Sequence, residues 1–337
     1  MGDLKVGVTL PDGPDYEAFL ALPDLLYPEN HPGRQFKNSI LNDHLITLLV
    51  AKRNDEVAGR CSLYFPPGML VNGAPAACVG HYECIDHPEI AQKLLNEASQ
   101  LARSGGKAYL VGPMNGSTWN HYRFSDHNDS PNFFLEPYHH LYYHEQFRSV
   151  GFENLDTYSS SLVEDMRFDH QRADELEAQF KSQGIRFRTF NQKQVTEELE
   201  RIWHLISLAF VDNYLFTPIT KAGFLEKYLP LMDYLNPAYI HLAEDASGRV
   251  VGLNFCMLDH WHIDQSRLIA KTVARHPDPQ FAGMGTVLGK LIYQQAAQDG
   301  ITSFIHAFIR EGNASGHLSN SLAGKTYNTY TLYKKAL

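Results

Sequence analysis

The sequence Gln280-Phe281-Ala282-Gly283-Met284-Gly285 separates two segments with different apolar patterns. Before it, Leu268 to Val273 is a short apolar run typical of a buried strand. After it, apolar residues from Val287 to Ile292 recur at helical spacing and predict an amphipathic helix that ends at Gly300. Glycines at such a junction let backbone N–H groups approach a ligand, and a helix N-terminus favours anions. The stretch therefore predicts either a cradle for a pyrophosphate or a simple tight turn.

The residues on both sides of this loop read as an alternation of strands and helices. Residues 186–190 predict a strand and residues 195–214 a helix, and 224–232 continue helically. Further predicted strands are 239–243, 250–258, 303–309 and 327–333, with a short helix at 313–322.

The first half of the chain shows the same order of elements. Its predicted strands are 45–53, 57–64, 77–85, 108–111 and 157–163, and its predicted helices are 88–105 and 142–150, with one or two helical turns at 16–26. The opening residues, to about Arg34, show little periodicity and no predicted strand. We therefore predict a duplicated fold: a domain over residues 1–163, a charged linker or connecting helix over 164–185, and a domain over 186–337.

Length and composition exclude several classes of protein. A chain of 337 residues is longer than one hydrophobic core usually supports. Its formal charge of -9 argues against general nucleic-acid binding. Four cysteines without Cys-x-x-Cys spacing are typical of free thiols in a reducing compartment, and no apolar run is long enough to span a membrane. We expect a cytoplasmic protein, whose oligomeric state the sequence does not indicate.

The pattern Gln-x-x-Gly-x-Gly between a strand and a helix resembles the acyl-CoA loop of the GNAT N-acetyltransferase superfamily. The resemblance covers residues 186–337, where a strand after the helix ends near Asn313. It implies an α/β (mixed α+β) fold of two tandem GNAT-like domains, each a mostly antiparallel mixed sheet flanked by helices. It also implies acetyl-CoA or another acyl-CoA as cofactor. The residues that would hold it are Val273, Arg275, Gln280, Ala282, Gly283, Met284, Gly285, Thr286 and Asn313.

The activity that the resemblance implies is transfer of an acyl group to a small amine-bearing acceptor. In the family's mechanism a carboxylate or ordered water removes the proton of the attacking amine. Candidate bases are Glu83 and Glu136 in the first half and Asp259 in the second.

The family's proton donor has no obvious counterpart. Where many members place a tyrosine that protonates the leaving thiolate, this chain has Asn320 and Ser321, so Tyr327 or Tyr330 would have to substitute. That departure keeps a second hypothesis open, a non-catalytic protein of the same fold that binds a small polar ligand.

The first half resembles a degenerate copy of the same domain. Its third strand is followed by residues 84–89, Cys-Ile-Asp-His-Pro-Glu, which lack the glycine pattern and place acidic residues where a pyrophosphate would lie, so we expect no cofactor there. Two segments rich in aromatic and amide groups, 112–123 and 135–143, are suited to gripping a small polar acceptor, or else pack internally. The acceptor-binding candidates are Asn115, Trp119, Asn120, Tyr122, Arg123 and Tyr138.

Histidines of the first half do not complete a metal site by spacing. His140 and His144 have i,i+4 spacing, but no nearby Glu-x-x-His or cysteine supplies further ligands. We therefore expect no metal.

Overall fold

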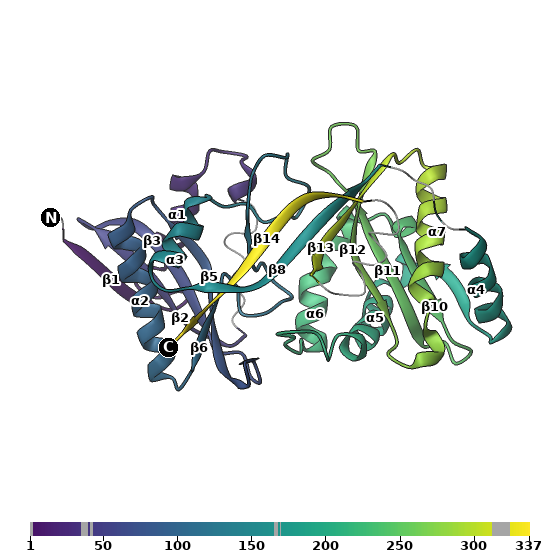
Figure 1. The fold of residues 1–337 in the computed structure, drawn as a ribbon, viewed down its shortest axis with the longest axis horizontal. Coiled ribbons are helices and arrows are strands. Elements are labelled where there is room, and N and C mark those ends of the chain that lie inside the picture. The colour runs from purple at the N-terminus through teal and green to yellow at the C-terminus, as the bar shows by residue number, and fades with distance from the viewer. Residues whose placement is uncertain (1–2, 35–39, 41–42, 165–167, 169, 312–323) are drawn as a thin grey trace.

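The computed structural model describes residues 3–34, 40, 43–164, 168, 170–311 and 324–337. Its main feature is one mixed sheet that runs the length of the molecule, with strands in the order β1-β2-β3-β5-β6-β14-β8-β13-β12-β11-β10-β9 (Figure 1). The elements of the first half are β1 (Leu4–Thr9), α1 (Tyr16–Leu26), β2 (Leu45–Arg53), β3 (Glu56–Tyr64), β4 (Leu70–Val71), β5 (Ala74–Cys84), α2 (Pro88–Ser104), β6 (Tyr109–Gly112), β7 (Phe124–Ser125), α3 (Tyr142–Ser149) and β8 (Glu153–Val163). Those of the second half are α4 (His170–Ser182), β9 (Arg186–Thr189), α5 (Val195–Ala209), α6 (Lys221–Tyr228), β10 (Ile240–Glu244), β11 (Val250–Leu258), β12 (Arg267–Arg275), α7 (Met284–Gln298), β13 (Ser303–Arg310) and β14 (Lys325–Ala336).

The two halves repeat one arrangement, as the order of predicted elements indicated. In each, an antiparallel run of strands leads into a parallel pair joined by a helix, β5 and β6 through α2 and β12 and β13 through α7. The prediction was wrong for the opening residues, which include the strand β1 paired antiparallel with β2. Residues of β1 are mostly half-buried or exposed, as expected of an edge strand, so they carry little hydrophobic periodicity.

The halves are joined by an exchange of their last strands. β14 pairs antiparallel with β6 on one side and with β8 on the other, and β8 pairs in turn with β13. Figure 1 shows β14 running from the second half into the first beside β8. The domain boundaries at residues 163 and 186 stay predictions, and the sheet itself crosses them.

Strand alternation in the second half sends successive side chains to opposite layers of helix. Leu242 packs in the cluster that contains α5 residues such as Leu199, whereas its neighbour Ala243 packs with Leu288 of α7. α4, predicted from its charge and helix propensity as a connecting helix, lies against α7 (Figure 1). Lys290 of α7 forms ion pairs with Asp174 and Glu177 of α4, which fixes this contact.

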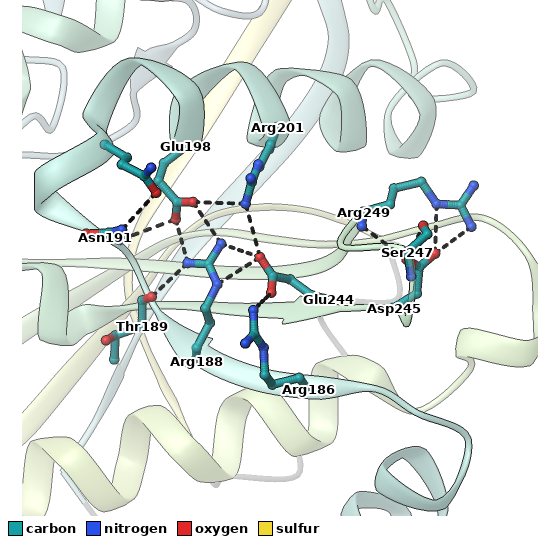
Figure 2. A network of polar contacts seen from close by, with 11 residues as sticks. Arg186, Arg188, Thr189, Asn191, Glu198, Arg201, Glu244, Asp245, Ser247 and Arg249 are labelled. Atoms are coloured by element: carbon teal, nitrogen blue, oxygen red, sulfur yellow. Dashed lines mark hydrogen bonds and ion pairs between the residues drawn. The ribbon is translucent and has the colours of Figure 1, made fainter.

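A buried ion network holds α5 against the edge of the sheet (Figure 2). The Arg188 guanidinium on β9 donates to Glu244 on β10 through Nε (2.8 Å) and to Glu198 on α5 through Nη2 (2.8 Å). Both glutamates are 1% exposed. Burial alone would raise the pKa of Glu244, but hydrogen bonds from Arg188 and Arg186 outweigh it and hold that pKa below its ordinary value. The network therefore links three elements around two carboxylates that are almost fully buried.

Candidate active site

The parallel strands β12 and β13 separate partway along their length. They pair from Arg267–Ser303 to Ala270–His306, and the register ends there, although both strands continue. Residues 272–275 remain paired on their other side with β11. Within the described ranges, this stretch of β12 thus leaves one edge of backbone donors and acceptors open toward β13.

The predicted glycine loop lies at the end of this open edge. Gly283 is the N-cap of α7 with φ of 89°, a left-handed conformation that favours glycine, and no side chain caps the helix there. A Cβ on Gly285 would meet only the Cγ1 of Val273, at 3.6 Å. The first N–H groups of a helix have no intrahelical acceptor. The structure therefore brings together the open strand, through Val273, and the uncapped amides of residues 283–285, while the Thr286 N–H donates to Gly283 O (3.0 Å).

The polar side chains of the loop are occupied by the loop itself. Gln280 donates through Nε2 to the carboxylate of Asp278 (2.9 Å), which also accepts the Gln280 backbone N–H (3.0 Å). The exposed Arg275 donates through Nη1 to the backbone oxygens of His276 (2.8 Å) and Pro277 (3.2 Å). These contacts shape the turn that presents Ala282 and Gly283. Asn313 lies outside the described residues.

The corresponding edge of the first half is filled by the chain. β5 pairs with β6 only from Ala76 to Cys78. Beyond that point the Met114 N–H donates to Val79 O (2.8 Å), and the His81 N–H donates to the Asn115 side chain (2.8 Å). A Cβ on Gly80 would lie 2.5 Å from Met114 O. Asn115 therefore supports β5. The absence of a cofactor from the first half stays a prediction, and the filled strand edge gives a physical reason for it.

Several predicted residues line one cleft of the first half, which Trp261 of the second half also borders; its volume is about 600 Å³ including space open to solvent. The structure brings to it side chains from the third strand of the first half and from both polar segments. They are Glu83, Asn115, Tyr122, Arg123, Glu136 and Tyr138.

Glu136 is the carboxylate of this cleft with the most perturbed proton affinity. It is 4% exposed and accepts hydrogen bonds from Asn328 Nδ2 (2.9 Å), from Asn132 Nδ2 (3.0 Å) and from the Tyr330 hydroxyl. Burial raises its pKa, and these hydrogen bonds limit the rise. Tyr330 also lies 3.0 Å from Ser160 Oγ, so the two candidates Glu136 and Tyr330 form one network.

The other candidate acids and bases are held in closed contacts. Glu83 is buried and accepts hydrogen bonds from the hydroxyls of Tyr27 and Tyr143, each at 2.8 Å. Asp259 is fully buried in an ion pair with Arg267 (2.6 Å). The hydroxyl of Tyr327 donates to the backbone oxygen of Pro131. Their assignment as catalytic groups remains a prediction.

Trp119 and Asn120 belong to a first-half loop, and their side chains contact residues of the second half. The Trp119 indole N–H donates to Thr217 O (2.8 Å), and its ring lines an apolar pocket beneath α5 and α6 that is partly open to solvent. Asn120 accepts a hydrogen bond from Lys227 of α6 (3.1 Å). Tyr138 instead lies edge-on to Tyr27 in the first half, with ring centroids 6.1 Å apart. The predicted acceptor residues therefore divide between two cavities.

Arg123 lines the first of these cavities, in an aromatic cage. Its guanidinium carbon is 3.9 Å from the Tyr122 ring centroid, 4.4 Å from that of Phe308 and 4.5 Å from that of Tyr158. Phe308 has a φ of 59° at an irregularity of β13, and sequence reasoning did not single it out. Lys227 and Lys271 were also missed, because a lysine in a helix or strand carries no signal of its burial.

The cysteines and His144 are buried in closed contacts. All four cysteines are free and buried, and burial raises the pKa of Cys84 to about 12, so its thiolate is scarce at neutral pH. His144 contacts Tyr333 Oη (2.8 Å) and Ser125 O (2.7 Å). No cluster of three or more His, Cys, Asp or Glu in the described ranges is arranged to hold a metal, and the absence of a metal stays a prediction. Every helix in those ranges is too short or too polar to cross a bilayer.

Comparison with known proteins identifies the fold. No protein-family model matches the sequence, and a search of curated proteins finds no match. Among solved structures, the chain is similar to a GCN5-related N-acetyltransferase from Sphaerobacter thermophilus, with a TM-score of 0.52 and 10% identity over 99% of this chain and 95% of that one. It is also similar to a tandem GNAT protein from the clavulanic acid biosynthesis pathway, with a TM-score of 0.53 and 13% identity over 99% and 98% of the two chains.

A third similar structure is the GCN5-related glucosamine N-acetyltransferase region of a fungal multi-domain GH3 β-N-acetylglucosaminidase. Its TM-score is 0.58 at 13% identity over 99% of this chain, which spans 38% of the fungal protein. Identities this low carry the fold and no activity. The matches extend over both halves and the exchanged strands between them. The chain therefore has the tandem fold of GNAT N-acetyltransferases.

Proposed function

We propose that the protein is an acyl-CoA-dependent N-acyltransferase, with acetyl-CoA as cofactor and a small amine as acceptor. The observation that carries the proposal is the open edge of residues 271–275 beside the uncapped N-terminus of α7. An exposed strand edge offers hydrogen bonds to the amides of a pantetheine arm, and an uncapped helix N-terminus offers N–H groups to a pyrophosphate. The absence of such an opening in the first half supports one cofactor per chain.

The residues that would hold the cofactor are those of β12 and the loop. Backbone groups near Val273 would bind the pantetheine and polarise the acyl carbonyl, while the N–H groups from Ala282 to Thr286 would bind phosphate oxygens. Arg275, at the mouth of the loop, would leave its backbone partners to reach a phosphate. When bound, acyl-CoA supplies an activated thioester.

Glu136 is the general base that the geometry favours. Its raised pKa brings it closer to the pH at which an amine is acylated, and it lines the cleft into which the acceptor would enter. Tyr330, which is fully buried, donates to Glu136 and would hold its carboxylate in position. We expect Glu136→Gln to lower kcat with little effect on the affinity for acetyl-CoA.

The alternative is a ligand-binding protein without catalysis. It is favoured by the lack of a tyrosine at Asn320 and Ser321 and by the closed contacts of Glu83 and Asp259. A thiol-release assay across small amines separates the two, because CoA release that depends on the loop excludes a pure binder.

Gly285 offers a sharp test of the cofactor site. A side chain fits there without steric conflict, so Gly285→Glu places a carboxylate beside the amides without breaking α7, and an acidic residue in a first helical turn favours the helix. Gly285→Ala is the matched control. By calorimetric titration we expect the wild type and the alanine variant to bind acetyl-CoA with similar affinity. We expect the glutamate variant to bind it at least roughly tenfold more weakly.

Two results would contradict the proposal. One is the absence of acetyl-CoA binding by the wild type at about 1 mM ligand. The other is equal affinity in Gly285→Glu when thermal unfolding shows that the variant is folded.

A further inference from the structure

Arg123 is a buried cation for which the described part of the chain supplies no anionic partner. Its exposed fraction is 6%, and its Nε and Nη1 have no hydrogen-bond partner among the described residues. Aromatic rings surround it, and they compensate a buried charge only in part. Burying an unpaired charge is costly. A guanidinium that lines a cleft in this state is suited to an anion that arrives from solution.

Two half-buried lysines extend the positive charge toward the second half. The register of β11 with β12 skips from Phe255–Thr272 to Cys256–Ala270, so Lys271 is the extra residue of a β-bulge. Bulges re-aim side chains, and the Lys271 ammonium lies 5.7 Å from the Tyr228 ring of α6. Burial, with help from Arg123, lowers the pKa of Lys271 to about 8.

Lys227 completes the group from the neighbouring helix. Its ammonium donates to Asn120 (3.1 Å), and burial together with Lys271 lowers its pKa to about 8. Arg123, Lys227 and Lys271 come from a first-half loop, α6 and β12, and no ion pair to any of them is found in the described part of the chain. We call these three residues the cation cluster.

The two lysines of the cation cluster lie beside residues that line the apolar pocket beneath α5 and α6, whereas Arg123 lines the neighbouring cleft. Thr272, next to Lys271, lines that cavity, and so does Tyr228. Trp119, next to Asn120, forms another part of its wall. The rest of the lining is aliphatic and aromatic. Positive charge at the rim of an apolar cavity fits a ligand with an anionic head and an apolar body.

We propose that the acceptor is a small carboxylate with an apolar substituent, such as an aliphatic or aromatic amino acid, whose carboxylate binds the cation cluster and whose side chain enters the cavity. The proposal rests on the proposed function, because the amine of this acceptor is the group to be acylated. The open edge of β12 begins at Lys271, so a carboxylate bound there places the attached amine next to the strand that would hold the thioester.

The test compares a carboxylate with its neutral amide in the absence of acyl-CoA. The probes are 4-methylpentanoate and 4-methylpentanamide, which share the apolar body of leucine, titrated calorimetrically into the full chain. We expect the wild type to bind the carboxylate roughly tenfold more tightly than the amide. In Arg123→Met and Lys271→Met that preference disappears.

Arg148→Met is the matched control. Arg148 also lies over a tyrosine ring, that of Tyr333 at 5.7 Å, but it is exposed and lines neither cavity, so its variant keeps the preference. Thermal unfolding verifies that each variant is folded, and the amide probe shows that the apolar cavity is intact. Equal binding of carboxylate and amide by the wild type, or an unchanged preference in both Arg123→Met and Lys271→Met, overturns the proposal.

Titration with acyl-CoA separates this inference from the proposed function. If acetyl-CoA does not bind but the carboxylate binds in an Arg123-dependent way, the proposed function fails and the carboxylate site stands. If Arg123→Met weakens succinyl-CoA binding without affecting the free carboxylate, the cation cluster serves the acyl group, and the assignment to the acceptor is overturned.

Discussion

Arg188→Met is the substitution whose effect on stability follows most directly from the structure. It removes the cation that bridges β9, β10 and α5, and it leaves the methylene stem in place. Glu198 and Glu244, each 1% exposed, then face one another without the guanidinium that separates them (Figure 2). Arg186 and Arg201 also contact Glu244, but their side chains are 72% and 47% exposed, and solvent weakens their compensation.

Removing one partner of a buried ion pair typically costs about 3–5 kcal/mol. The remaining exposed arginines place the expected loss near the lower end, at about 3 kcal/mol. Arg249→Met is the control, because Arg249 also binds an acidic residue, Asp245, but its side chain is 55% exposed (Figure 2). Exposed pairs contribute about 1 kcal/mol or less. Both variants therefore remove one positive charge, and they differ in how far the ion pair that is broken is buried.

The assay is urea unfolding followed by circular dichroism at several pH values. The pKa of Glu244 is held below its ordinary 4.5 in the folded state, so its contribution is complete above that pH and is lost as the pH falls through the folded value. We expect the full difference between wild type and Arg188→Met at pH 7 and a smaller one at about pH 4. Equal losses in Arg188→Met and Arg249→Met, or a gap that does not shrink with acid, would refute the reasoning.

Three further predictions concern other parts of the molecule. Trp119→Ala should cost about 3 kcal/mol in thermal unfolding, because it removes part of the wall of the apolar pocket, with its packing contacts, and the indole donor to Thr217; a change below about 1 kcal/mol would show that the first-half loop is only loosely docked. Burial lowers the pKa of His306 to about 4, so the wild type should lose up to roughly 3 kcal/mol as the pH falls from about 6.5 to 4. His306→Gln should flatten that slope in a pH series of unfolding midpoints, and an unchanged slope would assign it to other groups. Lys290→Met should release α4 from α7 by removing the cation bound by Asp174, at a cost of about 1 kcal/mol; hydrogen exchange should quicken in α4, and unaltered protection there would contradict this.

The order of elements could be predicted from the sequence because burial imposes periodicity. β11 and β12 are apolar runs between turn signals, and α7 has its apolar residues at helical spacing, so these elements were found within about two residues. β1 was missed because an edge strand carries little of that pattern. The pairing of β14 between β6 and β8 could not be predicted, since a strand's own pattern does not specify its neighbours.

The cofactor loop could be predicted and the acceptor site only in pieces. A run of residues close in sequence, such as 280–285, folds as a unit and keeps its spacing. The cation cluster instead combines Arg123, Lys227 and Lys271 from three elements, and one of them is oriented by a β-bulge. Neither that bulge nor the burial of a lysine can be predicted from a single sequence.

Because of the strand exchange, the sheet of the first half can be completed only after the last strand of the chain has been synthesised. During synthesis β6 emerges early, but β14, its neighbour in the sheet, is made only after the whole second half. Until then β6 presents an unpaired edge, which is prone to aggregation, and the first half has an incomplete core. Two polypeptides cut near residue 185 should therefore be insoluble when expressed separately and should assemble into one particle when expressed together.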